Sequence, residues 1–179
     1  MKTIDELLTE VAKNLNVQQP EPRKPAAVKE DKPNQPKPKP LKPLKLNLRT
    51  AKMLAAGVEH AAERLGVNVV TAVVNSGARL ICLEAMDNAY IVSVQAAQDK
   101  AYTAAALKMP TYRALEESRG GALDGLTNGG GILLLAGGEP LYSDGELVGA
   151  VGVSGGTKDQ DALLAKVAAE LFKNLWQKS

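Results

Sequence analysis

The chain has 179 residues, a formal net charge of +2, and only 3% aromatic residues. Its single cysteine excludes a disulfide framework and a cysteine-rich metal site. No stretch approaches the roughly 18 consecutive apolar residues of a membrane span, and the start of the chain lacks the apolar core of a signal peptide. We therefore expect a cytosolic protein that does not enter a membrane.

The first 19 residues are predicted to form an amphipathic helix. Thr3 and Glu6 have the spacing of a capping box, which starts a helix locally. The apolar residues recur every three or four positions and form one stripe: Ile4, Leu7, Leu8, Val11 and Leu15. An isolated helix of this length is marginal in water. The stripe therefore needs a partner, which is its own domain, a copy of itself or another protein.

Residues 20–45 are predicted to be a disordered, flexible linker. Eight of the ten prolines lie between positions 20 and 43, and the segment carries eight Lys or Arg against three Asp or Glu. It contains too few large apolar residues to offset the entropy cost of ordering. The 134 residues from 46 to 179 suit a single domain, which is slightly acidic, with twelve basic and fourteen acidic residues. Nucleic acid is not an expected partner, because its binding needs a basic face with stacking aromatics.

The sequence of residues 46–179, which we call the body, predicts an α/β fold of the α+β type, with helices packed on a five-stranded antiparallel sheet. The expected order is α-β-β-α-β-β-β-α. Periodicity and turn signals place helices at 48–65, 91–108 and 158–176, and strands at 68–74, 79–84, 132–135, 139–142 and 147–153. Residues 120–131 contain six glycines and are predicted to form a loop, at a length that favours a functional one.

The glycine-rich stretch 152–158 is similar to a phosphate-binding loop but does not match its pattern. Thr157 stands where the motif requires the glycine before Lys158. We interpret this stretch as a turn that leads into the last helix. Its backbone amides remain candidates for binding an anion.

His60 is the only histidine in the chain. Helical geometry places it nearly opposite the apolar face of its helix and beside Met53 and Gly57. One interpretation is an ordinary exposed residue. The other is that the small residues Ala56 and Gly57 leave room for a flat ligand or another subunit, with the imidazole as an axial iron ligand.

Five stretches of the body carry a specific pattern, in a resemblance that covers roughly residues 46–172 in order. They are 65–68 (LGVN), 72–77 (AVVNSG), 85–89 (AMDNA), 100–111 (KAYTAAALKMPT) and 145–156 (GELVGAVGVSGG). This pattern resembles the family of GlcG and HbpS proteins. It is most similar to the C-terminal domain of PduO-type proteins from propanediol-utilisation microcompartments.

The resemblance implies a haem-associated, profilin-like domain that assembles into homo-oligomers. It also implies a haem ligand on the first helix of the body, a role for which His60 is the only histidine available, although the family histidine lies about one turn earlier, near Gly57. The predicted cofactor site comprises six residues: His60, Gly57, Met53, Met86, Lys100 and Tyr102. The adenosyltransferase domain of PduO is replaced by the N-terminal segment, so cobalamin adenosylation is not implied.

The N-terminal segment resembles the encapsulation peptides that load cargo into bacterial microcompartments. Together with the body, it predicts a haem- or tetrapyrrole-binding cargo protein in the lumen of such a compartment, where it supports cofactor or redox maintenance. Shell or cargo proteins would bind the helix of residues 1–19. Two alternatives remain open, which are a haem-degrading enzyme and a non-catalytic protein that organises cargo.

Overall fold

The computed structural model describes residues 46–177, so the predicted helix at 1–19 and the predicted linker at 20–45 lie outside the described residues. The described elements are α2 (Leu48–Leu65), β1 (Val70–Asn75), β2 (Leu80–Ala85), α3 (Ile91–Leu107), α4 (Thr111–Glu117), β3 (Gly138–Ser143), β4 (Glu146–Ser154) and α5 (Lys158–Gln177). Four strands form one antiparallel sheet in the order β2-β1-β4-β3. This arrangement is an α+β fold.

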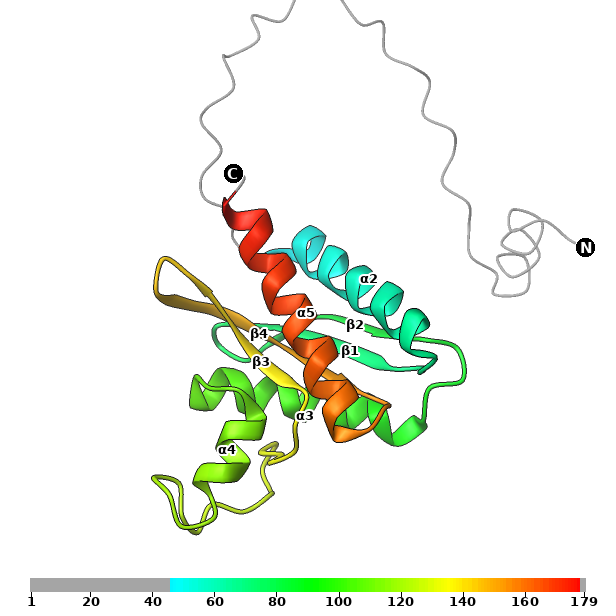
Figure 1. The fold of residues 1–179 in the computed structure, drawn as a ribbon. Helices are drawn as coiled ribbons and strands as arrows, with labels where there is room; N and C mark the ends of the chain where they lie inside the picture. The colour runs from blue at the N-terminus through cyan, green and yellow to red at the C-terminus, as the bar shows by residue number, and fades with distance from the viewer. Residues whose placement is uncertain (1–45, 178–179) are drawn as a thin grey trace, which may run out of the picture. The chain divides into compact units, whose positions relative to one another are not determined.

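Helices cover both faces of the sheet, as Figure 1 shows. Helices α2 and α5 pack against each other on one face, and α3 packs on β4 and β1 from the other. The central strand β1 is buried at its first five positions, which explains why its sequence is a continuous apolar run rather than an alternating one.

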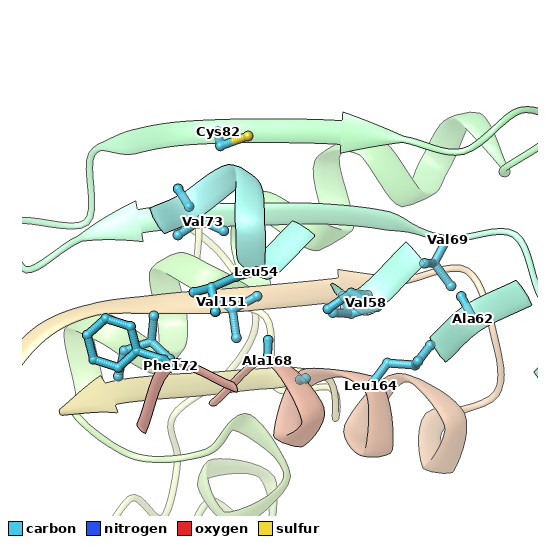
Figure 2. Packing of buried hydrophobic residues seen from close by; sticks show 14 residues of the cluster. Leu54, Val58, Ala62, Val69, Val73, Cys82, Val151, Leu164, Ala168 and Phe172 are labelled. Atoms are coloured by element: carbon cyan, nitrogen blue, oxygen red, sulfur yellow. The ribbon is translucent and has the colours of Figure 1, made fainter. Parts of the chain in front are cut away.

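The larger core lies between the sheet and the pair α2 and α5 (Figure 2). Leu54 and Val58 of α2 meet Val151 of β4, while Leu164 and Phe172 enter the same cluster from α5. All five side chains are almost fully buried. Burying a side chain of this size contributes about 1.5–3 kcal/mol, so this cluster fixes α2 against the sheet.

The opposite layer is built from small residues. Helix α3 presents alanines to the sheet, and Ala97 and Ala101 are fully buried. A Cβ atom added at Gly152 of β4 would collide with the backbone of Ala97 and Ala101. The small residues therefore allow α3 to lie unusually close to the sheet.

The five-strand expectation and the element order were wrong. Residues 132–135 do not form a strand, apart from one isolated bridge between Gly129 and Ile132. The backbone amides that a strand would pair instead donate hydrogen bonds to side chains. Leu133 N–H donates to Thr103 Oγ1 at 2.8 Å, and Leu134 N–H donates to Asn128 Oδ1 at 2.8 Å. Helix α4, which the sequence analysis did not predict, stands between α3 and β3. The order across the described residues is therefore α-β-β-α-α-β-β-α.

The other predicted elements are confirmed to within one or two residues at most ends. Helix α2 spans the predicted residues because both of its ends are encoded locally. The side chain of Asn47 accepts a hydrogen bond from Thr50 N–H at 3.0 Å, and Gly66 closes the helix with a φ of 67°. Residues 120–131 form turns without a helix or strand, as expected. None of the helices described between residues 46 and 177 meets the requirements for a transmembrane span.

Candidate functional site

The outward-facing residues of α2 form the candidate site, which we call the α2 outer face. It comprises Leu48, Arg49, Lys52, Met53, Ala56 and His60. Arg49, Met53, Ala56 and His60 follow one another at spacings of four, three and four residues, so they line one side of the helix. The opposite side of α2 carries the buried residues that fix the helix to the core. The packing that buries one side therefore holds the other side toward solvent.

An open depression of about 630 Å³ lies on this face and is lined by Leu48, Arg49, Lys52, Met53 and Ala56. Leu48 and Met53 are 54% and 48% exposed, so both contribute apolar surface to this depression. Arg49 and Lys52 add two cations beside this apolar surface. An apolar surface with two cations beside it suits a flat apolar molecule that carries acidic groups at one edge.

His60 lies one helical turn beyond Ala56, which is the last residue to line this depression, and does not line it itself. Its side chain is 76% exposed, and Nδ1 lies 3.8 Å from Glu63 Oε2, beyond hydrogen-bonding distance. The imidazole is therefore available to an external ligand. Met53 precedes His60 by seven residues, so the two side chains leave the helix about 10 Å apart along its axis.

Gly57 lies between the α2 outer face and α5. A Cβ atom added at Gly57 would collide with Cδ1 of Leu171 on α5. Leu171 thus occupies the space that the missing side chain provides. The structure gives Gly57 a role in the close packing of α2 against α5.

Met86 lies on the same side of the sheet as α2, at the end of β2. Its Sδ accepts a hydrogen bond from Val69 N–H at 3.4 Å. It lines a separate cavity of about 120 Å³, to which Ala55 and Glu59 of α2 also contribute. Met86 is therefore near α2 but outside the depression beside His60.

Lys100 and Tyr102 lie on α3, which covers the opposite face of the sheet from α2. Tyr102 is 37% exposed and lines a cavity of about 290 Å³ with Leu80 and Gly131. The sheet separates this cavity from His60. Within one chain, His60 and Tyr102 are not placed to bind the same ligand.

Lys100 is fully buried and its ammonium group already has two partners. Nζ donates to Asp161 Oδ2 at 2.6 Å and to the carbonyl oxygen of Val153 at 2.9 Å. Burial lowers the pKa of Lys100, and the hydrogen bond and charge of Asp161 oppose that shift. The pair connects α3 to α5 through the end of β4, which is a structural role.

The turn that leads into α5 also uses its own polar groups. Gly156 N–H donates to Asp161 Oδ1 at 2.9 Å, and Thr157 N–H donates to Gln160 Oε1 at 2.9 Å. These are the amides that the sequence analysis considered for an anion. In the structure, side chains of α5 bind them.

Two further groups have shifted pKa values and lie away from the α2 outer face. Burial raises the pKa of Glu139 on β3 to about 7, and the charge of Lys166 opposes that shift. Burial, followed by a hydrogen bond to Glu84, raises the pKa of the Cys82 thiol, which makes it a poor nucleophile. Neither group joins His60.

No cluster of three or more His, Cys, Asp or Glu side chains exists between residues 46 and 177. A bare metal ion is therefore not the ligand that the described side chains favour. Haem requires less of the protein, because the porphyrin supplies four nitrogen ligands and the chain supplies one or two axial ligands. The α2 outer face offers an imidazole, a thioether, apolar surface and two cations, and this donor set fits haem chemically.

Sequence reasoning found His60 and Met53 but missed Leu48, Arg49 and Lys52. The signal was present, because Arg49 precedes His60 by eleven residues, or about three helical turns. The prediction considered the neighbours of His60 on the outer side of the helix, Met53, Ala56 and Gly57, and did not extend to the cations near the start of the helix.

A family model described as "Haem degrading protein HbpS-like" matches residues 46–170. The chain belongs to the HbpS-like family. One relative is the "Uncharacterized 15.0 kDa protein in dhaT-dhaS intergenic region" of Citrobacter freundii, which is 40% identical over 133 residues. That alignment covers 73% of this chain and 94% of the relative.

A second relative of this HbpS-like chain is the corrinoid adenosyltransferase PduO of Salmonella typhimurium, which is 33% identical over 129 residues. The alignment covers 70% of this chain but only 38% of PduO. Among solved structures, a PduOC–haem complex is similar, with a TM-score of 0.67 and 32% identity, over 71% of this chain and 94% of that chain. The family resemblance predicted from the sequence is thus confirmed.

Proposed function

We propose that the α2 outer face binds haem or a related tetrapyrrole, with His60 as the iron ligand. The observation that carries this proposal is an exposed imidazole without a hydrogen bond, one helical turn beyond an apolar and cationic depression on the same helix. The similarity to a protein crystallised with haem supports the ligand class. Arg49 and Lys52 would bind the propionate groups, because cations beside a largely apolar surface favour carboxylates.

Bound haem would supply an iron centre and its electron-transfer chemistry. The chain itself would supply the imidazole, the apolar surface and the two cations. One helix face covers only one side of a flat ring, whereas binding sites normally bury most of the ligand. We therefore also propose that the chain forms a homo-oligomer in which a second copy covers the remaining surface.

The test is a titration of the full chain with haemin, followed by visible absorption. We expect a sharp Soret band that saturates at a fixed stoichiometry, with an affinity that falls at least about tenfold in His60→Ala, equivalent to about 1.4 kcal/mol. Arg49→Ala and Lys52→Ala should weaken binding less and leave the band position unchanged, because they act on the propionates. A wild-type spectrum in His60→Ala would refute the ligand assignment.

Matched variants test the other predicted ligands. Met53→Leu, Met86→Leu and Tyr102→Phe each remove a donor atom with little change in volume. If His60 is the ligand, Met86→Leu and Tyr102→Phe should keep the wild-type spectrum, because these residues lie outside the depression. A changed spectrum in either of them would relocate the site.

Haem degradation is the alternative function, and the description of the matching family model favours it. The same titrated sample separates the two functions. A Soret band that persists with reductant and oxygen supports a binding module, whereas progressive loss of the band supports an enzyme. An unchanged haemin spectrum at all protein concentrations would favour a cargo-organising protein.

We further propose that residues 1–19 direct the protein to the lumen of a bacterial microcompartment, where it supports cofactor or redox maintenance. The apolar stripe and the similarity of the body to PduO support this placement. Fused to a fluorescent protein, residues 1–19 should produce foci in cells with assembled shells. Leu7→Glu with Leu8→Glu should abolish the foci, because buried charges oppose docking.

A matched control introduces the same charges elsewhere in the segment. Thr9→Glu with Asn16→Glu places two carboxylates on the polar side that the spacing predicts, and the foci should persist. Diffuse fluorescence of the unmodified fusion in shell-forming cells would refute targeting by this segment.

A further inference from the structure

Strand β2 is an open edge of the sheet. Among the strands described between residues 46 and 177, it pairs with β1 only. Met86 N–H donates a hydrogen bond to the carbonyl oxygen of Val69, so the backbone groups of Met86 point toward β1. In an antiparallel pair the backbone groups of successive residues alternate in direction, so those of Leu83 and Ala85 point away from β1. The opposite edge strand, β3, differs, because its Gly138 N–H donates a hydrogen bond to Thr111 Oγ1 at 2.9 Å. The open edge thus presents unpaired hydrogen-bonding groups, which a further strand would satisfy.

A bulge gives this edge an unusual distribution of side chains. Leu80 and Leu83 are three residues apart, which would place them on opposite faces of a regular strand. The register shift between Val73 and Val74 brings both to the α3 side of the sheet. Leu80 accordingly lines a cavity with α3 residues, and Leu83 pairs with Ala72 of the α3-side core. The two leucines are 47% and 36% exposed.

We propose that β2 pairs antiparallel with β2 of a second copy of the chain, across a two-fold axis between Ile81 and Cys82. This register places Arg79 opposite Glu84, Leu80 opposite Leu83, and Ile81 opposite Cys82. A two-fold interface requires such reciprocity, because each contact occurs twice with the roles exchanged. The interface is distinct from the α2 outer face, so it is a second contact between copies, in addition to the one put forward under the proposed function.

Each opposed pair in this register is chemically matched. Leu80 and Leu83 share the α3 side, as described above, while Ile81 and Cys82 both pack toward the α2-side core. Arg79 is exposed, and no ion pair to it occurs within residues 46–177. Within one chain, Arg79 and Glu84 are about 16 Å apart along the strand, so they cannot pair with each other. Opposite charges facing each other across strands are favourable and like charges are not.

The composition of the edge also favours a strand as its partner. Lysine and proline are two of the devices that protect an edge from pairing, and β2 (LICLEA) contains neither, although it does contain a bulge, which is another such device. A second copy offers the same edge in the complementary direction. It therefore matches the apolar and the charged side chains of this edge at once.

Charge exchange tests this register in the full chain by sedimentation velocity. Arg79→Glu places two carboxylates opposite each other, and Glu84→Arg places two guanidinium groups opposite each other, each twice per dimer. Each variant should raise the dimer dissociation constant at least about tenfold. The double variant should restore it to near the wild-type value, because the opposed charges are then exchanged. Arg113→Glu, at an exposed position of α4, is the matched control and should have no effect.

The outcomes separate this interface from self-association in general. Rescue in the double variant supports the register, because no contact within one chain could produce it. An oligomeric wild type whose two single variants remain unchanged would overturn the interface but not self-association. A monomeric wild type at micromolar concentration would overturn both, and would leave the edge for a strand of another protein. The haemin titration reports on the α2 outer face separately.

Discussion

Lys100 and His60 were both predicted as site residues, and the structure places them in opposite environments. The Lys100 side chain is fully buried and hydrogen-bonded to Asp161 and Val153, whereas the His60 side chain is 76% exposed. The buried ammonium stabilises the junction of α3, β4 and α5, while the imidazole contributes little to packing. A nitrogen-bearing side chain is thus structural or available for binding according to its surroundings rather than its residue type.

The strongest test of this comparison removes the buried cation. Lys100→Met leaves the Asp161 carboxylate buried without its counter-ion, and we expect a loss of about 3–5 kcal/mol in the free energy of unfolding. Adding Asp161→Asn removes the stranded charge and should recover at least about 1 kcal/mol of that loss. Urea unfolding followed by circular dichroism measures both. A loss below about 1 kcal/mol for Lys100→Met would show that the pair contributes little.

The pH dependence of stability tests a second buried group, Glu139, which is 8% exposed. Its pKa in the folded state is about 7, above the ordinary value of 4.5. Between these values the folded state binds the proton more tightly than the unfolded state, so stability falls as the pH rises from about 4.5 to about 7. The expected fall is on the order of 2–3 kcal/mol.

Glu139→Gln should remove this dependence, because a neutral amide has no proton to lose. Its unfolding free energy should exceed that of the wild type at pH 8 and approach it at about pH 4. Urea unfolding at several pH values measures the difference. Parallel profiles for the two proteins would contradict the raised pKa.

Gly57 lies at the boundary between the buried and exposed regions, and its substitution should have a smaller effect. Gly57→Ala improves helix propensity by about 1 kcal/mol but forces Leu171 to move. The two effects nearly cancel, so we expect a net loss below about 1 kcal/mol in thermal unfolding, with an unchanged haemin spectrum. A changed spectrum would show that Gly57 belongs to the ligand site.

The smallest effect on stability is expected at His60. His60→Ala should change the free energy of unfolding by less than about 0.5 kcal/mol, because the exposed side chain leaves no cavity. The same variant should lose haemin affinity, which would separate a binding role from a packing role. Unfolding or a change of oligomeric state in this variant would assign His60 to packing or to an interface.

Much of the fold could be predicted from the sequence, because its signals are local. The ends of α2 follow from Asn47 and Gly66, and the β1–β2 hairpin follows from two apolar runs around a turn. Residues 132–135 were misread because their apolar run is also a local signal for a strand. The structure shows that the hydroxyl of Thr103, about thirty residues earlier, binds the amide that a strand would have used.

The amino-acid sequence alone predicts the family, the periodic faces of the helices and the position of His60 opposite the packed side of α2. Which of the predicted site residues share a surface depends on how distant segments pack. The sheet separates Tyr102 from His60, and Lys100 binds Asp161, sixty-one residues away in the chain. The physical reason is that helix and turn signals act over a few residues, whereas burial and ion pairing depend on which distant segments meet.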